Sequence, residues 1–412
     1  MDELSLPSGF RFECLMCGDC CGGWDIPVSE ESKKRVEGLD WRVVDSRLSG
    51  KNFFCKALKD ADFKWVLAKG ADDACVFLED GKCLIHKVAG YEAKDLTCRQ
   101  YPATFMKTPS GVCVGFSFAC RSIRENSGRP VSEYASEYEA LWDEMKDERK
   151  SRDISLAAGV KLSWSAYELL EDAFTRLILD TQGSLSEGIC ACTRIAAHLT
   201  AKTGKAKLDV GDVEAAASGA YGFRGKMAID AYFPKRQRIV LGFSVIPHAE
   251  KEGKLKDALN AVTYYNRFVK GAGRVKLKNL GEVNLSGLAD VEFKPEETKT
   301  KEFLVRYFTH FLFRKSLLVE PSVADNLKLM ATGYALTRFY ALAHAQKRGS
   351  SDTEYEDVAN AVGCVDRYFL LHSTLSKTLL SNKKTEFLLR KFIDQPDYVD
   401  CMLYEKPFTL PA

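Results

Sequence analysis

The 412-residue sequence lacks a dominant charge, because 59 Lys and Arg residues nearly balance 57 Asp and Glu residues and leave a net charge of +2. A near-neutral chain has no general positive field that would draw it to nucleic acid or to an anionic membrane surface. The sequence also lacks the run of about 20 apolar residues that a membrane-spanning helix needs. Its longest uncharged stretch, residues 108–120, is shorter and contains Pro, Gly and Ser. We therefore expect neither a nucleic-acid partner nor a membrane segment.

Several motifs of common enzyme classes are missing. Histidine is scarce, and no HExxH pair indicates a hydrolytic zinc site among His86, His198, His248, His310, His344 and His372. A P-loop lysine motif is absent, and the Gly271-Ala272-Gly273 segment follows a helical pattern instead of a strand, which argues against dinucleotide binding. No catalytic residue is therefore assigned.

The amino terminus gives an expectation about location. Residues 1–5 are acidic and lack the basic and then apolar order of a secretory signal. We expect a cytoplasmic protein, in which clustered cysteines are metal ligands or redox groups more often than disulfides.

Cysteine is abundant and unevenly placed. Ten of the fourteen cysteines fall within the first 120 residues: Cys14, Cys17, Cys20, Cys21, Cys55, Cys75, Cys83, Cys98, Cys113 and Cys120. Two-residue spacing from Cys14 to Cys20 lets several sulfurs reach one metal, and neighbouring glycines leave backbone N–H groups free to donate to sulfur. Adjacent side chains of an extended segment point in opposite directions, so one of Cys20 and Cys21 is expected to serve a second metal or to remain a thiol.

The number of centres stays open at this level. About eight sulfurs are enough for two four-ligand centres, or for one cluster with a redox-active remainder. Cys55 and Cys113 suit either ligation or packing, whereas burial as small apolar side chains is favoured for Cys190, Cys192, Cys364 and Cys401. Three cysteines at two-residue spacing are typical of a bacterial cubane loop, and zinc ribbons more often use two separated CxxC pairs. We expect a [4Fe–4S] cluster, with zinc as the alternative.

The pattern along the chain predicts a mainly α protein, with a loop-rich, metal-bound cysteine domain packed on a larger helical domain. The cysteine domain covers residues 1–125, in which residues 29–36 predict a short helix capped by Ser29 and the rest is loops with little apolar core. Residues 125–130 form a linker, and residues 131–412 form the helical domain. Apolar residues at helical spacing predict helices around residues 167–178, 189–199, 255–269, 303–312, 325–346, 351–369 and 386–393. Residues 238–247 and 275–293 are expected to be strands or crossover loops.

The cysteine motifs resemble a known family. CxxCxxCC at Cys14–Cys21 is followed by Cys75-Val76-Phe77-Leu78, Gly81-Lys82-Cys83 and Cys98-Arg99-Gln100-Tyr101-Pro102, which is similar to the YkgJ-type zinc- or iron-chelating cysteine-cluster family. Residues 21–27, CGGWDIP, the turn at residues 87–91, residues 117–120 and the helical segment at residues 303–315 look most like the flagellin lysine N-methylase group of that family.

The resemblance implies an iron–sulfur or zinc centre and a methyl-transfer activity. Its ligands would be Cys14, Cys17, Cys20, Cys21, Cys75, Cys83, Cys98 and Cys120. Arg99 and Tyr101 would support the bound cofactor, the arginine by offsetting the negative charge of the thiolates. Methyl groups would pass from S-adenosylmethionine to lysine side chains of flagellin or another protein. The alternatives are a non-catalytic metal-binding module, an electron-transfer protein, and a metal-delivery or redox-sensing protein that uses Cys55 and Cys113 as labile thiols.

Overall fold

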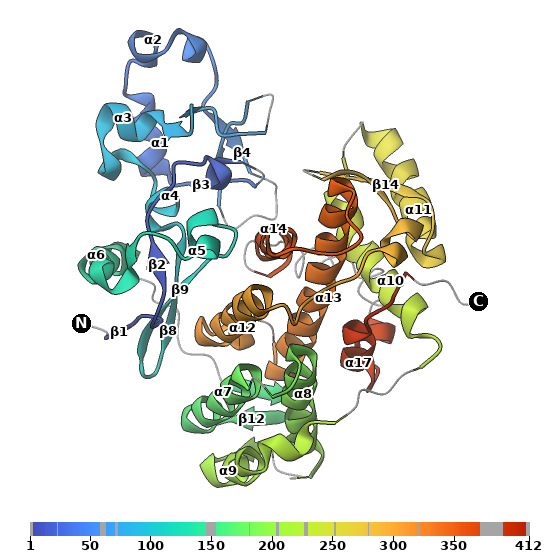
Figure 1. Cartoon of the computed structure of the whole chain (residues 1–412). Coiled ribbons are helices and arrows are strands. Elements are labelled where there is room, and N and C mark those ends of the chain that lie inside the picture. Colours follow the sequence, from blue (N-terminus) through green and yellow to red (C-terminus); the bar gives the residue numbers. More distant parts are fainter. Residues whose placement is uncertain are drawn as a thin grey trace. The chain divides into compact units, whose positions relative to one another are not determined.

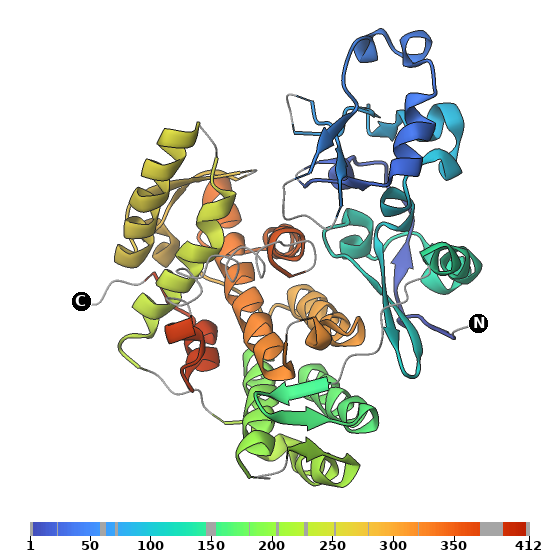
Figure 2. The same cartoon turned by 180° about the vertical axis from the view of Figure 1, so that it is seen from behind.

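The computed structural model describes residues 3–22, 24–57, 63–70, 73–145, 154–180, 182–202, 206–225, 230–250, 253–278, 280–319, 321–370 and 390–408. The chain divides into two compact units, Met1–Ser151 and Arg152–Ala412, here called the amino-terminal and carboxy-terminal units. Helices dominate and every sheet is small, as Figures 1 and 2 show, so the prediction of a mainly α protein is confirmed.

In its described residues, the amino-terminal unit contains two three-stranded sheets and two strand pairs. In order across each sheet, the strands are β1 (Leu4–Ser5), β9 (Gly111–Phe116) and β8 (Ala103–Thr108), then β3 (Pro27–Val28), β5 (Trp65–Leu67) and β4 (Phe54–Lys56). The pairs are β2 (Arg11–Phe12) with β10 (Arg129–Pro130), and β6 (Leu78–Glu79) with β7 (Lys82–Cys83). Strands β8 and β9 are antiparallel, with Ala103 opposite Phe116.

Short helices connect these strands. They are α1 (Glu30–Glu37), α2 (Trp41–Val44), α3 (Leu84–Ala89), α4 (Leu96–Gln100), α5 (Arg121–Glu125) and α6 (Ala135–Met145), with 3₁₀ turns η1 (Asp19–Cys21), η2 (Ser46–Leu48), η3 (Tyr91–Ala93) and η4 (Val131–Tyr134). The predicted cap of α1 is confirmed, because the Ser29 hydroxyl oxygen accepts from the Ser32 N–H at 3.1 Å.

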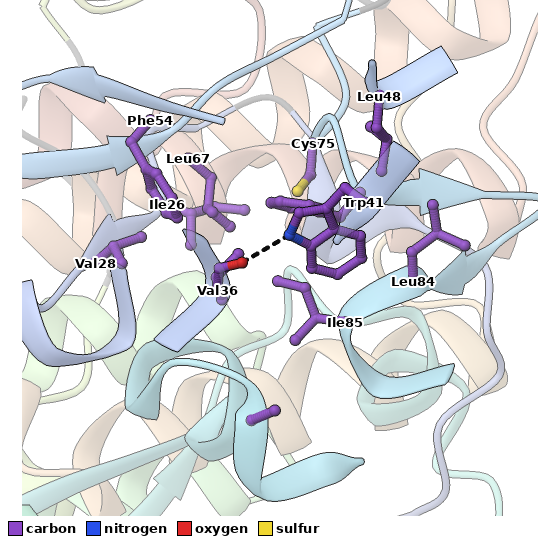
Figure 3. Packing of buried hydrophobic residues seen from close by; sticks show 12 residues of the cluster. Ile26, Val28, Val36, Trp41, Leu48, Phe54, Leu67, Cys75, Leu84 and Ile85 are labelled. Atoms are coloured by element: carbon purple, nitrogen blue, oxygen red, sulfur yellow. Dashed lines mark hydrogen bonds between the residues drawn. The ribbon is translucent and has the colours of Figure 1, made fainter. Parts of the chain in front are cut away.

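A hydrophobic core surrounds Trp41 in the amino-terminal unit (Figure 3). The Trp41 indole N–H donates to the Val36 carbonyl at 2.7 Å, and its ring lies 4.7 Å from the ring of Phe77, which is fully buried. The expectation of loops with little apolar core was therefore wrong. The core residues are spread from Ile26 to Ala93 with no helical or strand period, so only the folded chain collects them.

The carboxy-terminal unit is a helical assembly. Its helices are α7 (Trp164–Leu179), α8 (Leu185–Lys202), α9 (Val210–Ser218), α10 (Phe233–Val245), α11 (Lys254–Lys270), α12 (Thr298–Phe313), α13 (Val323–Arg348), α14 (Tyr355–Val365), the π-helical η9 (Asp366–Leu370) and α17 (Tyr398–Leu403). Its 3₁₀ turns are η5 (Ala220–Phe223), η6 (Ile246–His248), η7 (Ser286–Asp290) and η8 (Ser316–Leu318), and its strands are β11 (Ile154–Ala157), β12 (Val160–Leu162), β13 (Lys207–Leu208), β14 (Arg274–Leu277) and β15 (Gly281–Asn284). Helix α13 is buried along most of its length and packs against α8, α14 and α17.

Two predictions for this unit need correction. Residues 238–247 are not a strand, because they belong to helix α10 and turn η6, with Pro234 in the first turn of the helix, where its missing N–H costs nothing. The apolar stripe predicted for α11 lies largely outside the core: Leu255, Leu259 and Val262 are exposed, and Phe268 is buried against Gly242 of α10. Residues 275–293 contain the β14–β15 hairpin, as the strand alternative predicted.

The helix predicted for residues 386–393 lies mostly outside the described residues. None of the helices in the described parts of the chain combines the length and the apolar content that a bilayer crossing needs.

We expect Trp41→Ala to lower the free energy of unfolding of the amino-terminal unit by about 3–5 kcal/mol, the range for truncation of a large buried aromatic side chain. Urea denaturation followed by circular dichroism, at equal metal content, measures the change. Val88→Ala in helix α3 of the same unit is the control, because this side chain is 40% exposed and its truncation leaves no buried cavity. Equal destabilisation by both substitutions would contradict the assigned core.

Candidate metal centre

The first cysteine loop connects β2 to the 3₁₀ turn η1. Cys14 and Cys17 are exposed, and Cys20 and Cys21 are half-buried in η1. The backbone is left-handed at Met16 and Gly18, with φ of 50° and 77°, which folds the loop tightly back on itself. The Cys20 and Cys21 sulfurs lie 3.8 Å apart. The expectation that they point in opposite directions was wrong, because it assumed an extended segment and this segment is a helical turn.

The loop lies directly against the segment that carries Cys75 and Cys83. The Cys75 N–H donates to the Cys21 carbonyl at 2.6 Å. A Cβ atom on Gly81 would lie 2.2 Å from the Met16 carbonyl oxygen, and one on Gly18 would lie 3.1 Å from a Leu78 methyl group. Both glycines also have positive φ. The glycine of the Gly81-Lys82-Cys83 motif thus permits a backbone contact that a side chain would block.

Two short helices position Cys83 and Cys98: Cys83 directly precedes α3, and Cys98 lies within α4. Cys83 also pairs with Leu78 across β6 and β7. At the start of α4, the Asp95 carboxylate accepts from the Thr97 N–H at 2.9 Å. The second Asp95 oxygen accepts from the Ser29 N–H at 2.9 Å and from the Ser29 hydroxyl at 3.1 Å. One carboxylate therefore ties the Cys98 helix to α1.

Cys120 is the residue before helix α5. The turn that precedes it is held by the buried Arg124, whose guanidinium donates to the Phe118 and Ala119 carbonyls at 2.9 Å each. These contacts hold Cys120 close to the first cysteine loop. The thiols of Cys17 and Cys20 are near enough to act electrostatically on the Cys120 thiol.

The eight predicted ligands line two adjoining cavities. The smaller one, the inner hollow, has a volume of about 60 Å³ and its cysteines are Cys20, Cys21, Cys75, Cys83 and Cys98. The larger one, the outer cavity, has a volume of about 820 Å³ and its cysteines are Cys14, Cys17, Cys20, Cys21, Cys83, Cys98 and Cys120. Neither cavity is lined by Cys55, which is exposed on β4, or by Cys113, which is buried in β9.

The donor set suits zinc or iron, because both are bound by thiolates in four-sulfur sites. Among the residues that the structure describes, no three His, Cys, Asp or Glu side chains already have their ligand atoms arranged around one point. Closing a metal site therefore requires these side chains to move relative to one another.

In the absence of a cation, the surroundings of Cys20, Cys75, Cys98 and Cys120 raise the pKa of these four thiols and favour their protonated form. Burial raises the pKa of Cys75 to about 12, with the thiols of Cys83 and Cys20 acting in the same direction, and it raises the pKa of Cys120 to about 12. Burial likewise raises the pKa of Cys98, and the hydrogen bond with Cys21 and then burial raise the pKa of Cys20. A bound metal cation favours the thiolate form, so binding releases protons.

The structure places Arg99 and Tyr101 on the outer cavity. The guanidinium of Arg99 is buried and forms ion pairs with Glu92, at 2.7 Å, and with Glu144. Its Nε atom is buried without a hydrogen-bond partner in the structure described. Tyr101 lines both cavities and its ring faces Trp24, whose indole N–H donates to the Cys20 carbonyl at 2.9 Å.

Sequence reasoning missed three groups at this site. Lys94 lines both cavities. Its positive charge favours the thiolate forms of Cys20 and Cys98, and so partly offsets the rise in the pKa of each thiol. Tyr134 and Tyr138 line the outer cavity, and the Tyr138 hydroxyl is buried without a hydrogen-bond partner in the described structure. These tyrosines lie four residues apart, at the end of η4 and within α6, a spacing that indicates one helical face. The predicted domain boundary had assigned them to the helical domain.

Comparison with known families supports metal chelation by this part of the chain. Residues 13–114 match the family model "CxxCxxCC: Putative zinc- or iron-chelating domain". The matched range contains seven of the eight predicted ligands and ends before Cys120. A search of the curated proteins and a search of the solved structures each found no match. The similarity to the cysteine-cluster family is thus supported, and the finer similarity to flagellin lysine N-methylases is not.

In the metal-free protein, we expect iodoacetamide at pH 8 to modify the exposed Cys55 well before Cys75 and Cys98. Thiolate is the reacting species, and burial raises the pKa of both inner thiols far above 8, so their modification accelerates as the pH rises toward 10. Peptide mapping by mass spectrometry measures the order. Equal rates for the three cysteines at pH 8 would show that the inner thiols are neither buried nor shifted.

Proposed function

We propose that the amino-terminal unit holds an iron–sulfur or zinc centre on Cys14, Cys17, Cys20, Cys21, Cys75, Cys83, Cys98 and Cys120. The observation that carries the proposal is that all eight line two cavities that share four of them, although they come from four separate segments of the chain. Burial disfavours an unpaired thiolate because the charge loses its hydration. A bound cation compensates that charge and favours the thiolate form. We expect a [4Fe–4S] cluster ahead of zinc because of the CxxCxxC spacing.

Positively charged groups support this assignment. Lys94 acts electrostatically on Cys20 and Cys98, and Arg99 lies next to Cys98 with its Nε atom buried and unpartnered in the described structure. A thiolate-rich centre carries net negative charge, which nearby cations and N–H donors stabilise. These residues would tune and retain the centre without binding it directly. An iron–sulfur centre would supply electron transfer or polarise a bound ligand, whereas zinc would supply structural stability.

Anaerobically purified protein is expected to contain iron and sulfide in equal amounts, with broad absorption near about 400 nm, or zinc without colour. Cys20→Ser and Cys98→Ser should each lower the metal content, because each removes a buried ligand, and Cys55→Ser should leave it unchanged. Elemental analysis of the four proteins measures the result. Wild-type protein without stoichiometric metal would overturn the proposal.

Methyl transfer is a second candidate function, which the outer cavity favours. Its volume of about 820 Å³ falls within the range of about 300–1,000 Å³ that is typical of small-molecule sites. Its lining is predominantly apolar, and it adds aromatic side chains to the cysteines. We propose that an organic co-substrate binds there beside the metal ligands, with S-adenosylmethionine as the candidate donor and lysines of flagellin or another protein as acceptors.

Co-expression with flagellin tests this candidate. We expect the mass of flagellin to increase in steps of one methyl group on lysine, and we expect no increase with the Cys20→Ser variant. Intact-mass and peptide analysis of purified flagellin measure both. Unmodified flagellin beside metal-loaded protein, together with no heat of S-adenosylmethionine binding in calorimetry, would leave the non-catalytic metal-binding or electron-transfer module as the function of this chain.

A further inference from the structure

The eight cysteines occupy two different environments. Cys75 is a member of the hydrophobic core around Trp41, and Cys21, Cys83 and Cys98 pack against that core. The other four, Cys14, Cys17, Cys20 and Cys120, are not part of it. Cys14 and Cys17 are exposed to solvent, whereas Cys75 is only 8% exposed. The surroundings thus divide the cysteines into two sets of four.

The two cavities give part of the same division. Cys75 lines only the inner hollow, Cys14, Cys17 and Cys120 line only the outer cavity, and the other four cysteines line both. Two of those four, Cys20 and Cys21, are adjacent residues with sulfurs 3.8 Å apart. The chain contacts separate them: the Cys21 carbonyl accepts from the Cys75 N–H at 2.6 Å, and Cys21, not Cys20, packs against the core.

Neighbouring thiols follow this grouping in part. Cys98 lies close to Cys75 and Cys83, and Cys120 lies close to Cys17 and Cys20. Two interactions cross the division, because Cys20 acts on Cys75 and also interacts with Cys21. Each set contains four soft sulfur donors, the number that one zinc ion or one [4Fe–4S] cluster takes.

We propose that the amino-terminal unit holds two separate four-thiolate centres, an inner centre on Cys21, Cys75, Cys83 and Cys98 and an outer centre on Cys14, Cys17, Cys20 and Cys120. This inference rests on the proposed metal-binding function. The inner centre is enclosed by core side chains and serves structure. The outer centre faces the cavity of about 820 Å³ and is the one that a bound ligand reaches.

The two centres differ in access to solvent, which makes them separable. A chelator reaches the outer centre through the exposed side of Cys14 and Cys17, whereas release from the inner centre requires opening of the Trp41 core. EDTA is therefore expected to remove the metal of the wild-type protein in two phases of equal amplitude. The slow phase should follow local unfolding of the core.

The test compares the metal content of full-length wild type with an inner variant, Cys75→Ser with Cys98→Ser, an outer variant, Cys14→Ser with Cys17→Ser, and a control, Cys55→Ser with Cys113→Ser. We expect the control to match the wild type and the outer variant to retain half of the metal and only the slow EDTA phase. The inner variant removes core thiols and is expected to lose at least half of the metal.

The outer variant decides the proposal, because its two substitutions are at exposed positions and leave the core intact. Loss of all metal from it, or a single EDTA phase in the wild type, would show one shared centre and overturn the division while metal binding stands. Wild-type protein that holds no metal would instead overturn the metal-binding function on which the division rests.

Discussion

The close approach of the first cysteine loop to the Cys75–Cys83 segment is the constraint on which the amino-terminal unit depends. Only glycine at position 81 leaves room for the Met16 carbonyl, and the Cys75 N–H then reaches the Cys21 carbonyl at 2.6 Å. These backbone contacts bring together cysteines that are far apart in the sequence before any metal is bound.

The cysteines of this cluster differ in solvent exposure, because some of them pack in or against the hydrophobic core and others do not. Cys75 belongs to the core that contains Trp41 and Phe77, whereas Cys14 and Cys17 are exposed and line the outer cavity. A thiolate in the core is costly without a cation, whereas one at the cavity is partly hydrated. The same cluster therefore combines a part suited to holding structure with a part that a ligand can reach.

The carboxy-terminal unit is organised around different interactions. Arg314 and Asp366 form a fully buried ion pair at 2.8 Å, and Arg338, also buried, donates to the Leu403 and Met402 carbonyls and to Gln237. Charges taken out of water in this way must be paired or hydrogen-bonded, so they restrict how the helices can pack. Cys190, Cys192 and Cys401 are buried here, as predicted, and Cys364 is half-buried. This unit is thus a helical body in which three of these four cysteines are small core residues.

The sequence by itself determined the helices with strong apolar periods, the Ser29 cap and the identity of the clustered thiols, because these depend on neighbours a few residues away. It did not determine that residues 238–247 form a helix or that Leu255, Leu259 and Val262 face outward, because burial against other segments decides both. The Trp41 core and the contributions of Lys94 and Tyr138 are likewise properties of the tertiary structure. Spacing along the chain shows which sulfurs are able to bind metal, but only the packing of distant segments places each sulfur in the core or at the cavity.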